Sequence, residues 1–406
     1  MAPVRPFKIT IPDSEIEKLR KKLSLATFPE EVEFSDDWHY GAPLKDIRRL
    51  AQYWQDGFDW RSAEAKLNEL PQFSTAISVD GHGDIDVHFV HQKSTRADSI
   101  PLLFCHGWPG SFLEVIKLLP LLTSGDDASK PSFHVVAPSL PNFGFSGRAP
   151  RRGFAIPQYA EVCHKLMKAL GYEHYVTQGG DWGYIITRMM TVLYPEHVLA
   201  AHVNYVRKTE PPTFTETPAT YLKHAVLPYS AEEKAGLERT SWFHNQGFGY
   251  NLEQSTRPNT IGFALADSPV ALLAWIYEKL HDWTDSYAWT DDEVLTWIGI
   301  YAFSTAGPEA SVRIYYESTH SQLELHSKAR AYVPGVPLGL SYFPRDLVVP
   351  PSTWGRSLGP VVFERRHQDG GHFAAYERPE KLAGDLMDMF GKGGGAEKVA
   401  KRITAA

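Results

Sequence analysis

Short apolar runs alternate with helical patterns in two stretches of the chain, residues 100–180 and residues 336–372. The runs read IPLLFC, FHVVAPSL and HYVTQ in the first stretch, and VPLGLSYF and VVFER in the second. Strands as apolar as these must be buried on both faces of a sheet, which requires a cover on either side. The pattern therefore predicts an α/β fold in which helices cover both faces of a mostly parallel sheet.

The rest of the chain predicts an N-terminal extension and an inserted helical cap. The extension has few strands and two amphipathic helical patterns, one with Ile16, Leu19 and Leu23 and the other with Leu44, Ile47, Leu50 and Trp54, so we expect it to pack on the α/β core. The run KTEPPTFTETP then breaks the strand–helix rhythm, and helical sequence rich in aromatic residues follows it. The predicted boundaries are the extension at 1–95, the first part of the core at 96–207, the cap at 208–330 and the second part of the core at 331–406.

The composition excludes several classes of protein. The chain has 48 Asp and Glu residues and 41 Lys and Arg residues, which gives a net charge of −7. This charge leaves no basic surface for nucleic acid. The two cysteines, Cys105 and Cys163, supply neither a disulfide framework nor a zinc site. No window reaches the roughly 18 apolar residues of a membrane span, and Arg5 and Lys8 stand where a signal peptide is apolar. We expect a cytoplasmic protein.

The run Gly179-Gly180-Asp181-Trp182-Gly183 predicts a nucleophile elbow between the strand-like HYVTQ and the helix-like YIITRMMTVLY. The tight turn admits only small residues two positions on either side of its centre, and it lifts the central side chain above the sheet edge. That side chain is Asp181, so attack by its carboxylate would form an ester whose carbonyl belongs to the enzyme. Taken alone, the run also fits an ordinary Gly-rich turn with a solvated Asp.

Two further elements stand where a nucleophile needs its partners. The run LFCHGWPGS ends a strand in a Gly/Pro turn, and we expect the N–H groups of Trp108 and Trp182 to form an oxyanion hole. Asp346 follows a predicted strand, and His372 lies in the later run GGHF. The order nucleophile, acid, histidine then makes His372 the base and Asp346 the residue that orients it.

A second run, Gly355 to Gly359, matches the pattern Gly-x-Ser-x-Gly. It is followed by Pro360 and the strand-like VVFERR, whereas a nucleophile elbow requires a helix there. The run also comes after the acid, so we predict a loop without a catalytic role.

With these motifs assembled, the chain resembles the microsomal-type epoxide hydrolases, especially the soluble fungal members without a membrane anchor. The resemblance covers nearly the whole length and rests on HGWPGS, GGDWG, QSTRP followed by SPVALLAW, and GGHFAA with ERP. It implies an α/β-hydrolase fold with an N-terminal meander and a helical cap. It also implies that no metal or organic cofactor is needed and that a homodimer is a family-level expectation.

The resemblance further implies that two cap tyrosines, Tyr250 and Tyr315, hold the epoxide oxygen. Tyr316 is adjacent to Tyr315, and the two point about 100° apart on a helix, so only one can face the site. The family pattern favours Tyr315. Many relatives carry Glu as the acid, and Asp346 agrees with the fungal branch.

The implied activity is hydrolysis of a small-molecule epoxide by water to a vicinal trans diol, an ether-bond hydrolysis with a role in detoxification. Asp181 would open the ring, and His372 with Asp346 would activate the water that hydrolyses the ester. A haloalkane dehalogenase is an alternative, although it has no use for paired phenols. A biosynthetic relative that cyclises epoxides and a non-catalytic ligand-binding homologue are further alternatives; the intact acid, base and nucleophile argue against the latter.

Overall fold

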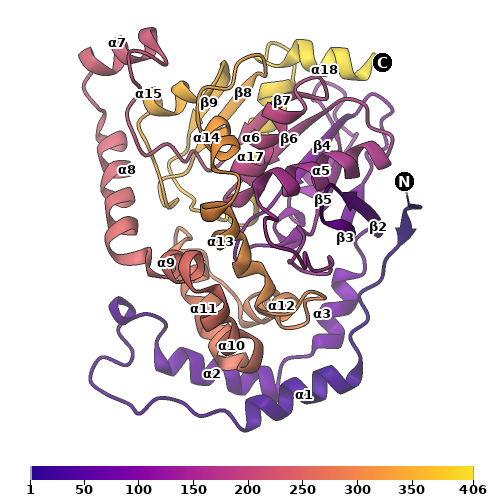
Figure 1. Cartoon of the computed structure of the whole chain (residues 1–406), viewed down its shortest axis with the longest axis vertical. Helices are drawn as coiled ribbons and strands as arrows, with labels where there is room; N and C mark the ends of the chain where they lie inside the picture. Colours follow the sequence, from indigo (N-terminus) through magenta and orange to yellow (C-terminus); the bar gives the residue numbers. More distant parts are fainter. Residues whose placement is uncertain (1, 406) are drawn as a thin grey trace.

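Nine strands form one sheet in the computed structural model, which describes residues 2–405 (Figure 1). Their order is β1-β2-β3-β5-β4-β6-β7-β8-β9. The pairs from β1 to β5 are antiparallel, and every pair from β5 to β9 in that order is parallel. The bounds are β1 (Arg5–Pro6), β2 (Gln72–Val79), β3 (Gly83–Gln92), β4 (Ile100–Cys105), β5 (Phe133–Pro138), β6 (Tyr175–Gly179), β7 (Val198–Val203), β8 (Leu338–Tyr342) and β9 (Val361–Arg366). The predicted mostly parallel sheet is confirmed.

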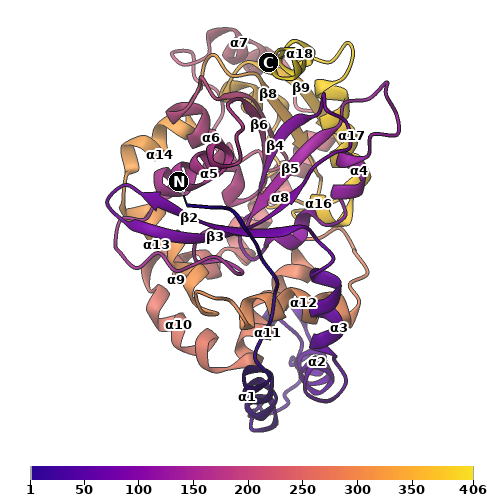
Figure 2. The ribbon, with the colours of Figure 1, turned by 90° about the vertical axis from the view of Figure 1, so that its right-hand side faces the viewer.

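Helices cover both faces of the parallel part of the sheet. Helices α5 and α6 lie on one face, and α4 and α17 lie on the other (Figure 2). The strands β4, β6, β7 and β8 are buried along their whole length because both faces are covered. The core helices are α4 (Leu119–Thr123), α5 (Ile156–Ala169), α6 (Trp182–Leu193), α15 (Ser352–Gly355), α16 (Ala374–Glu377), α17 (Pro379–Phe390) and α18 (Glu397–Thr404), with short 3₁₀ turns η2 (Phe112–Val115) and η5 (Arg356–Leu358).

The N-terminal residues form three helices and then join the sheet. Helices α1 (Asp13–Ser24) and α2 (Leu44–Asp56) occupy the two predicted amphipathic stretches and bury their apolar side chains, so both are confirmed. After the turn η1 (Trp38–Tyr40) and helix α3 (Trp60–Leu67), strands β2 and β3 pair along eight residues. The sequence predicts few strands before residue 95, and the structure differs in having β2 and β3 there. Acidic residues near the start of β3 shorten its apolar pattern, so the sequence does not indicate this strand. This part of the chain therefore completes the sheet as well as packing beside it.

Over the described residues, the segment between β7 and β8 contains helices joined by loops and no strand. Its elements are α7 (Pro218–Val226), α8 (Ala231–Trp242), the π-helical turn η3 (Phe243–Gly247), α9 (Gly249–Thr256), α10 (Pro258–Asp267), α11 (Pro269–Asp282), α12 (Asp291–Ala302), η4 (Ala310–Val312), α13 (Arg313–His320) and α14 (Leu323–Arg330). We call this segment the cap. No single helix within residues 2–405 is long and apolar enough to cross a membrane, and the pair α10 and α11, which passes that test together, bends by 114°.

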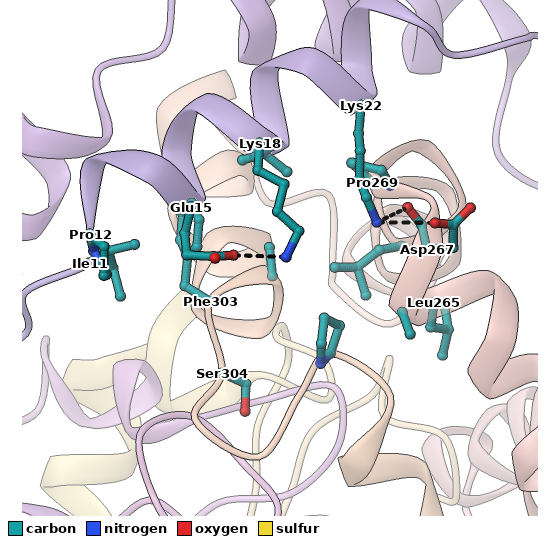
Figure 3. Close-up of a pocket in the computed structure, with 15 residues that line it drawn as sticks. Ile11, Pro12, Glu15, Lys18, Lys22, Leu265, Asp267, Pro269, Phe303 and Ser304 are labelled. Atoms are coloured by element: carbon teal, nitrogen blue, oxygen red, sulfur yellow. Dashed lines mark hydrogen bonds and ion pairs between the residues drawn. The ribbon is translucent and has the colours of Figure 1, made fainter.

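Helices α1 and α2 lie against α10 and α11 of the cap, on the side away from the sheet (Figure 1). The Lys22 ammonium donates to the carbonyl oxygen of Asp267 at 2.7 Å and to its carboxylate at 3.1 Å, as Figure 3 shows. A hollow of about 350 Å³ lies between these elements, and Leu265 and Phe303 are among its lining residues. The N-terminal helices thus support the cap from outside.

Candidate active site

A sharp turn between β6 and α6 carries Asp181. Its φ of 47° and ψ of −122° lie outside the ordinary regions for a residue with a side chain, as in a strained nucleophile elbow. A Cβ on Gly183 would collide with the carbonyl oxygen of Cys105, and one on Gly179 would collide with the carbonyl of Gly183. The strand, tight turn and helix predicted for this run are confirmed, with glycine where backbones approach most closely.

Asp181 lies within hydrogen-bonding distance of two groups from distant parts of the chain. Its Oδ1 accepts from the backbone N–H of Trp108 at 2.7 Å, and its Oδ2 lies 3.3 Å from Nε2 of His372. The other ring nitrogen of His372, Nδ1, lies 2.6 Å from Oδ1 of Asp346. His372 and Asp346 are buried, and Asp181 is half-buried. The structure thus brings the predicted nucleophile, base and acid into one chain of contacts.

Two negative charges act on His372. Burial alone lowers the pKa of its imidazole, but the carboxylates of Asp346 and Asp181 outweigh burial and raise that pKa to about 10. In the free protein His372 is therefore an imidazolium between two carboxylates. The two carboxylates orient the protonated ring. His372 cannot act as a base, however, until one of these two negative charges is lost.

The two predicted cap tyrosines approach Asp181 from the other side. Tyr250 on α9 and Tyr315 on α13 have ring centroids 5.8 Å apart, and both pack against the indole of Trp108. Tyr315 is 2% exposed, whereas its neighbour Tyr316 is 38% exposed and points outward. The structure therefore turns Tyr315, and not Tyr316, toward the site.

Two polar groups here are buried without a hydrogen-bond partner among residues 2–405, the hydroxyl of Tyr315 and the indole N–H of Trp182. Burial and the charge of Asp181 raise the pKa of Tyr250, and burial, Tyr250 and Asp181 raise that of Tyr315. Both phenols are therefore neutral donors at ordinary pH. A buried donor without an acceptor is costly, so the hydroxyl of Tyr315, beside that of Tyr250, is suited to donate to an oxygen atom supplied by a ligand.

The predicted oxyanion donors differ in their present contacts. The N–H of Trp108 already donates to Asp181. Trp182 is the first residue of α6, and its backbone N–H donates to no other described residue. Both N–H groups belong to the turns on either side of Asp181. They can therefore stabilise a negative charge that forms on the carbonyl oxygen of an Asp181 ester.

Residues that the sequence analysis did not assign to the site tie the cap to His372. The carbonyl oxygen of Trp283, at the end of α11, accepts from the N–H of His372 at 2.7 Å. The carboxylate of Glu377 accepts from the N–H groups of Gly371, at 2.7 Å, and Asp285, at 3.0 Å. Trp283 had no distinguishing signal among the aromatic residues of the cap. The cap therefore helps to hold the histidine loop.

The space around these groups is almost closed. The hollow beside Asp181 has a volume of about 20 Å³, enough for one water molecule. It is lined by Asp181, Trp182, Tyr184, Ile185, Tyr205, Arg207, Phe243, His244, Phe248, Tyr250, Asn251, Tyr315, Arg330 and Val348. Its cap wall includes the π-helical turn η3, a type of distortion that is frequent at functional sites.

Other candidate positions lie outside this cluster. Ser357 of the second Gly-x-Ser-x-Gly run is buried and donates to the carbonyl of Trp354 at 2.6 Å. Its surroundings are the short helical turns α15 and η5, so the predicted loop is wrong; β9 follows, as expected. Within residues 2–405, no three His, Cys, Asp or Glu side chains are grouped as metal ligands.

Comparison with known proteins agrees with this arrangement. The family described as "Epoxide hydrolase N terminus" matches residues 4–115, and the family "alpha/beta hydrolase fold" matches residues 100–223. A protein of Stigmatella aurantiaca is 38% identical over 95% of this chain and 84% of its own length. Epoxide hydrolase 1 of Sus scrofa is 33% identical over 96% of this chain and 88% of its own. The chain shares 34% sequence identity with Aspergillus niger epoxide hydrolase. The two structures match over 95% of each chain with a TM-score of 0.81.

These similarities extend over nearly the whole chain and include both the N-terminal segment and the core. They confirm the predicted α/β-hydrolase fold and favour the epoxide hydrolases over the dehalogenase alternative. The chain therefore belongs to the epoxide hydrolases of the α/β-hydrolase fold.

Proposed function

We propose that this epoxide hydrolase converts a small epoxide and water into a vicinal diol through a covalent ester on Asp181. The observation that carries the proposal is the position of the Asp181 carboxylate. One side of it meets His372 at 3.3 Å, and the other side faces two buried tyrosines. A nucleophile, a base and two acids for the departing oxygen are thus within one site.

In the first half-reaction, an oxygen of Asp181 attacks a ring carbon from the face opposite the breaking carbon–oxygen bond, which leads to a trans diol. The electron pair of that bond goes to the epoxide oxygen. Tyr250 and Tyr315 hydrogen-bond this oxygen as its charge develops and supply its proton. Their raised pKa values keep both phenols protonated beforehand.

In the second half-reaction, the ester has no negative charge, so one of the two carboxylates that raise the pKa of His372 is lost. The imidazolium can then give up its proton, which passes through water to the tyrosinate left by the first half-reaction and restores the phenol, and Asp346 keeps the neutral ring oriented. His372 takes a proton from water, and the resulting hydroxide attacks the carbonyl carbon of Asp181. The N–H groups of Trp108 and Trp182 stabilise the oxyanion until the diol leaves and Asp181 is regenerated.

A single turnover in heavy-oxygen water tests this route. With enzyme in excess over styrene oxide, the diol should carry no heavy oxygen, because its new oxygen comes from Asp181. Repeated turnover should place the label in the peptide that contains Asp181, detected by mass spectrometry. A fully labelled diol in the first turnover would instead show direct attack by water. The homodimer, the cytoplasmic location and the role in detoxification stay predictions.

A further inference from the structure

Arg207 follows β7 at the carboxyl edge of the sheet and lines the same hollow as Asp181 and the two cap tyrosines. Its side chain is half-buried. Over residues 2–405 its guanidinium donates no hydrogen bond and forms no ion pair; only its carbonyl oxygen accepts, from the hydroxyl of Tyr184 at 3.3 Å. The donors of this guanidinium are therefore free of protein acceptors among the described residues and can bind a group that enters the hollow.

Asp181 does not require Arg207 as a counter-ion. The carboxylate already accepts from Trp108 and faces the imidazolium of His372. The positive charge of Arg207 is therefore additional to the charges that the proposed reaction uses.

The surroundings of Arg207 are positive. Arg330 and His244 line the same hollow, and Asp181 is the only acidic residue among the described lining residues. Burial and the charge of Arg207 lower the pKa of Arg330 and that of His244, so both lie close enough to feel it. An anion at this wall would relieve the repulsion between the guanidinium groups of Arg207 and Arg330.

We propose that Arg207 binds a carboxylate on the substrate and thereby makes the enzyme selective for epoxides that carry an acid group. This inference rests on the proposed function of Asp181. A guanidinium presents a planar fork of donors that matches the two oxygens of a carboxylate. Bound in this way, the anionic group of the substrate is neutralised before it meets the negative nucleophile.

The test compares 5,6-epoxyhexanoate with its neutral isostere 5,6-epoxyhexanamide, which differ in the charge of the end group. The wild-type enzyme should show a kcat/KM for the acid at least about tenfold above that for the amide, expressed mainly in KM. Arg207→Gln should lower this acid-to-amide ratio by about tenfold or more, and Arg207→Lys should retain part of it. Arg257→Gln is the matched control, because that exposed arginine lies outside the hollow and bonds only to the neighbouring carbonyl.

A second measurement needs no variant. Hexanoate should inhibit hydrolysis of styrene oxide by the wild-type enzyme at least about tenfold more strongly than hexanamide does. Equal inhibition, or an unchanged acid-to-amide ratio in folded Arg207→Gln, would overturn the proposal. Failure of the proposed function is a different result, since styrene oxide would then yield no ester on Asp181 in the wild-type enzyme.

Discussion

Asp181 is both the proposed nucleophile and one of the two charges that raise the pKa of His372 to about 10. We expect Asp181→Asn to abolish diol formation, because a neutral amide is a poor nucleophile, while the nearly isosteric side chain preserves the fold. The same change imitates the uncharged ester, so the pKa of His372 should fall. Product analysis and an NMR titration of His372 measure the two effects. Full activity in freshly purified protein, or an unchanged titration, would contradict this account.

The tyrosines Tyr250 and Tyr315 face the same small hollow and each offers one hydroxyl. We expect Tyr250→Phe and Tyr315→Phe each to slow ring opening by about 10- to 1000-fold, the usual effect of losing one preorganised donor. Pre-steady-state formation of the ester is the measurement. Tyr316→Phe is the control, because the exposed Tyr316 points away from Asp181. A defect in Tyr316→Phe with a normal Tyr315→Phe would mean that the roles of the two residues are exchanged.

Much of the candidate site follows from local sequence. The glycines around Asp181 encode a close backbone approach, and the chain order sets Asp346 and His372 after later strands. Trp283 and Arg207 could not be found in this way. Their roles depend on how the cap closes over the core and on which donors remain free, and neither property leaves a spacing pattern in the sequence.

Hydrogen bonds from one buried side chain of the core stabilise the end of α14, the last helix of the cap. Arg188 on α6 donates to the carbonyl oxygens of Ala329, Ala331 and Leu358 at 2.6, 2.7 and 2.9 Å. Arg188→Met should lower the free energy of unfolding by about 3 kcal/mol or more, because it removes three hydrogen bonds and leaves the carbonyls of Ala329 and Ala331 without donors, while Leu358 keeps its bond from the N–H of Val333. Urea unfolding measures the loss. The control Lys328→Met removes only an exposed pair on α14 and should change stability by less than about 0.5 kcal/mol.

The strands of the parallel sheet were predictable because both of their faces are covered and their sequences are apolar throughout. Strands β2 and β3 were missed because they lie in the antiparallel end of the sheet, where polar and exposed positions interrupt the apolar pattern. The helices of the extension were predictable from a single apolar face. Their contact with the cap was not, since Lys22 and Asp267 are far apart in the sequence.

Over the whole molecule, buried titratable groups set how stability depends on pH. Burial lowers the pKa of eight histidines: to about 3 for His88, to about 4 for His91, His106, His164, His202 and His326, and to a smaller extent for His134 and His244. The unfolded chain takes up these protons from about pH 6.5 downward, so the histidines make the fold lose stability as the pH falls below that value. Burial raises the pKa of Glu114 to about 8 and that of Glu377 to about 7. These two groups therefore make the fold lose stability as the pH rises above 4.5. His372 likewise loses its stabilising proton as the pH approaches 10.

The buried histidines outweigh the two glutamates on the acid side, whereas above neutrality stability is lost through Glu114, up to about pH 8, and through His372, up to about pH 10, so we expect maximal stability near pH 7. The midpoint of urea unfolding should fall steeply between pH 6.5 and pH 4 and more gently between pH 7 and pH 10. His88→Gln should reduce the number of protons linked to acid unfolding by about one, because His88 sits between Ser139 and Gln72 with no room for a charge. If His88→Gln shows the wild-type proton number, buried histidines are not what limits stability in acid.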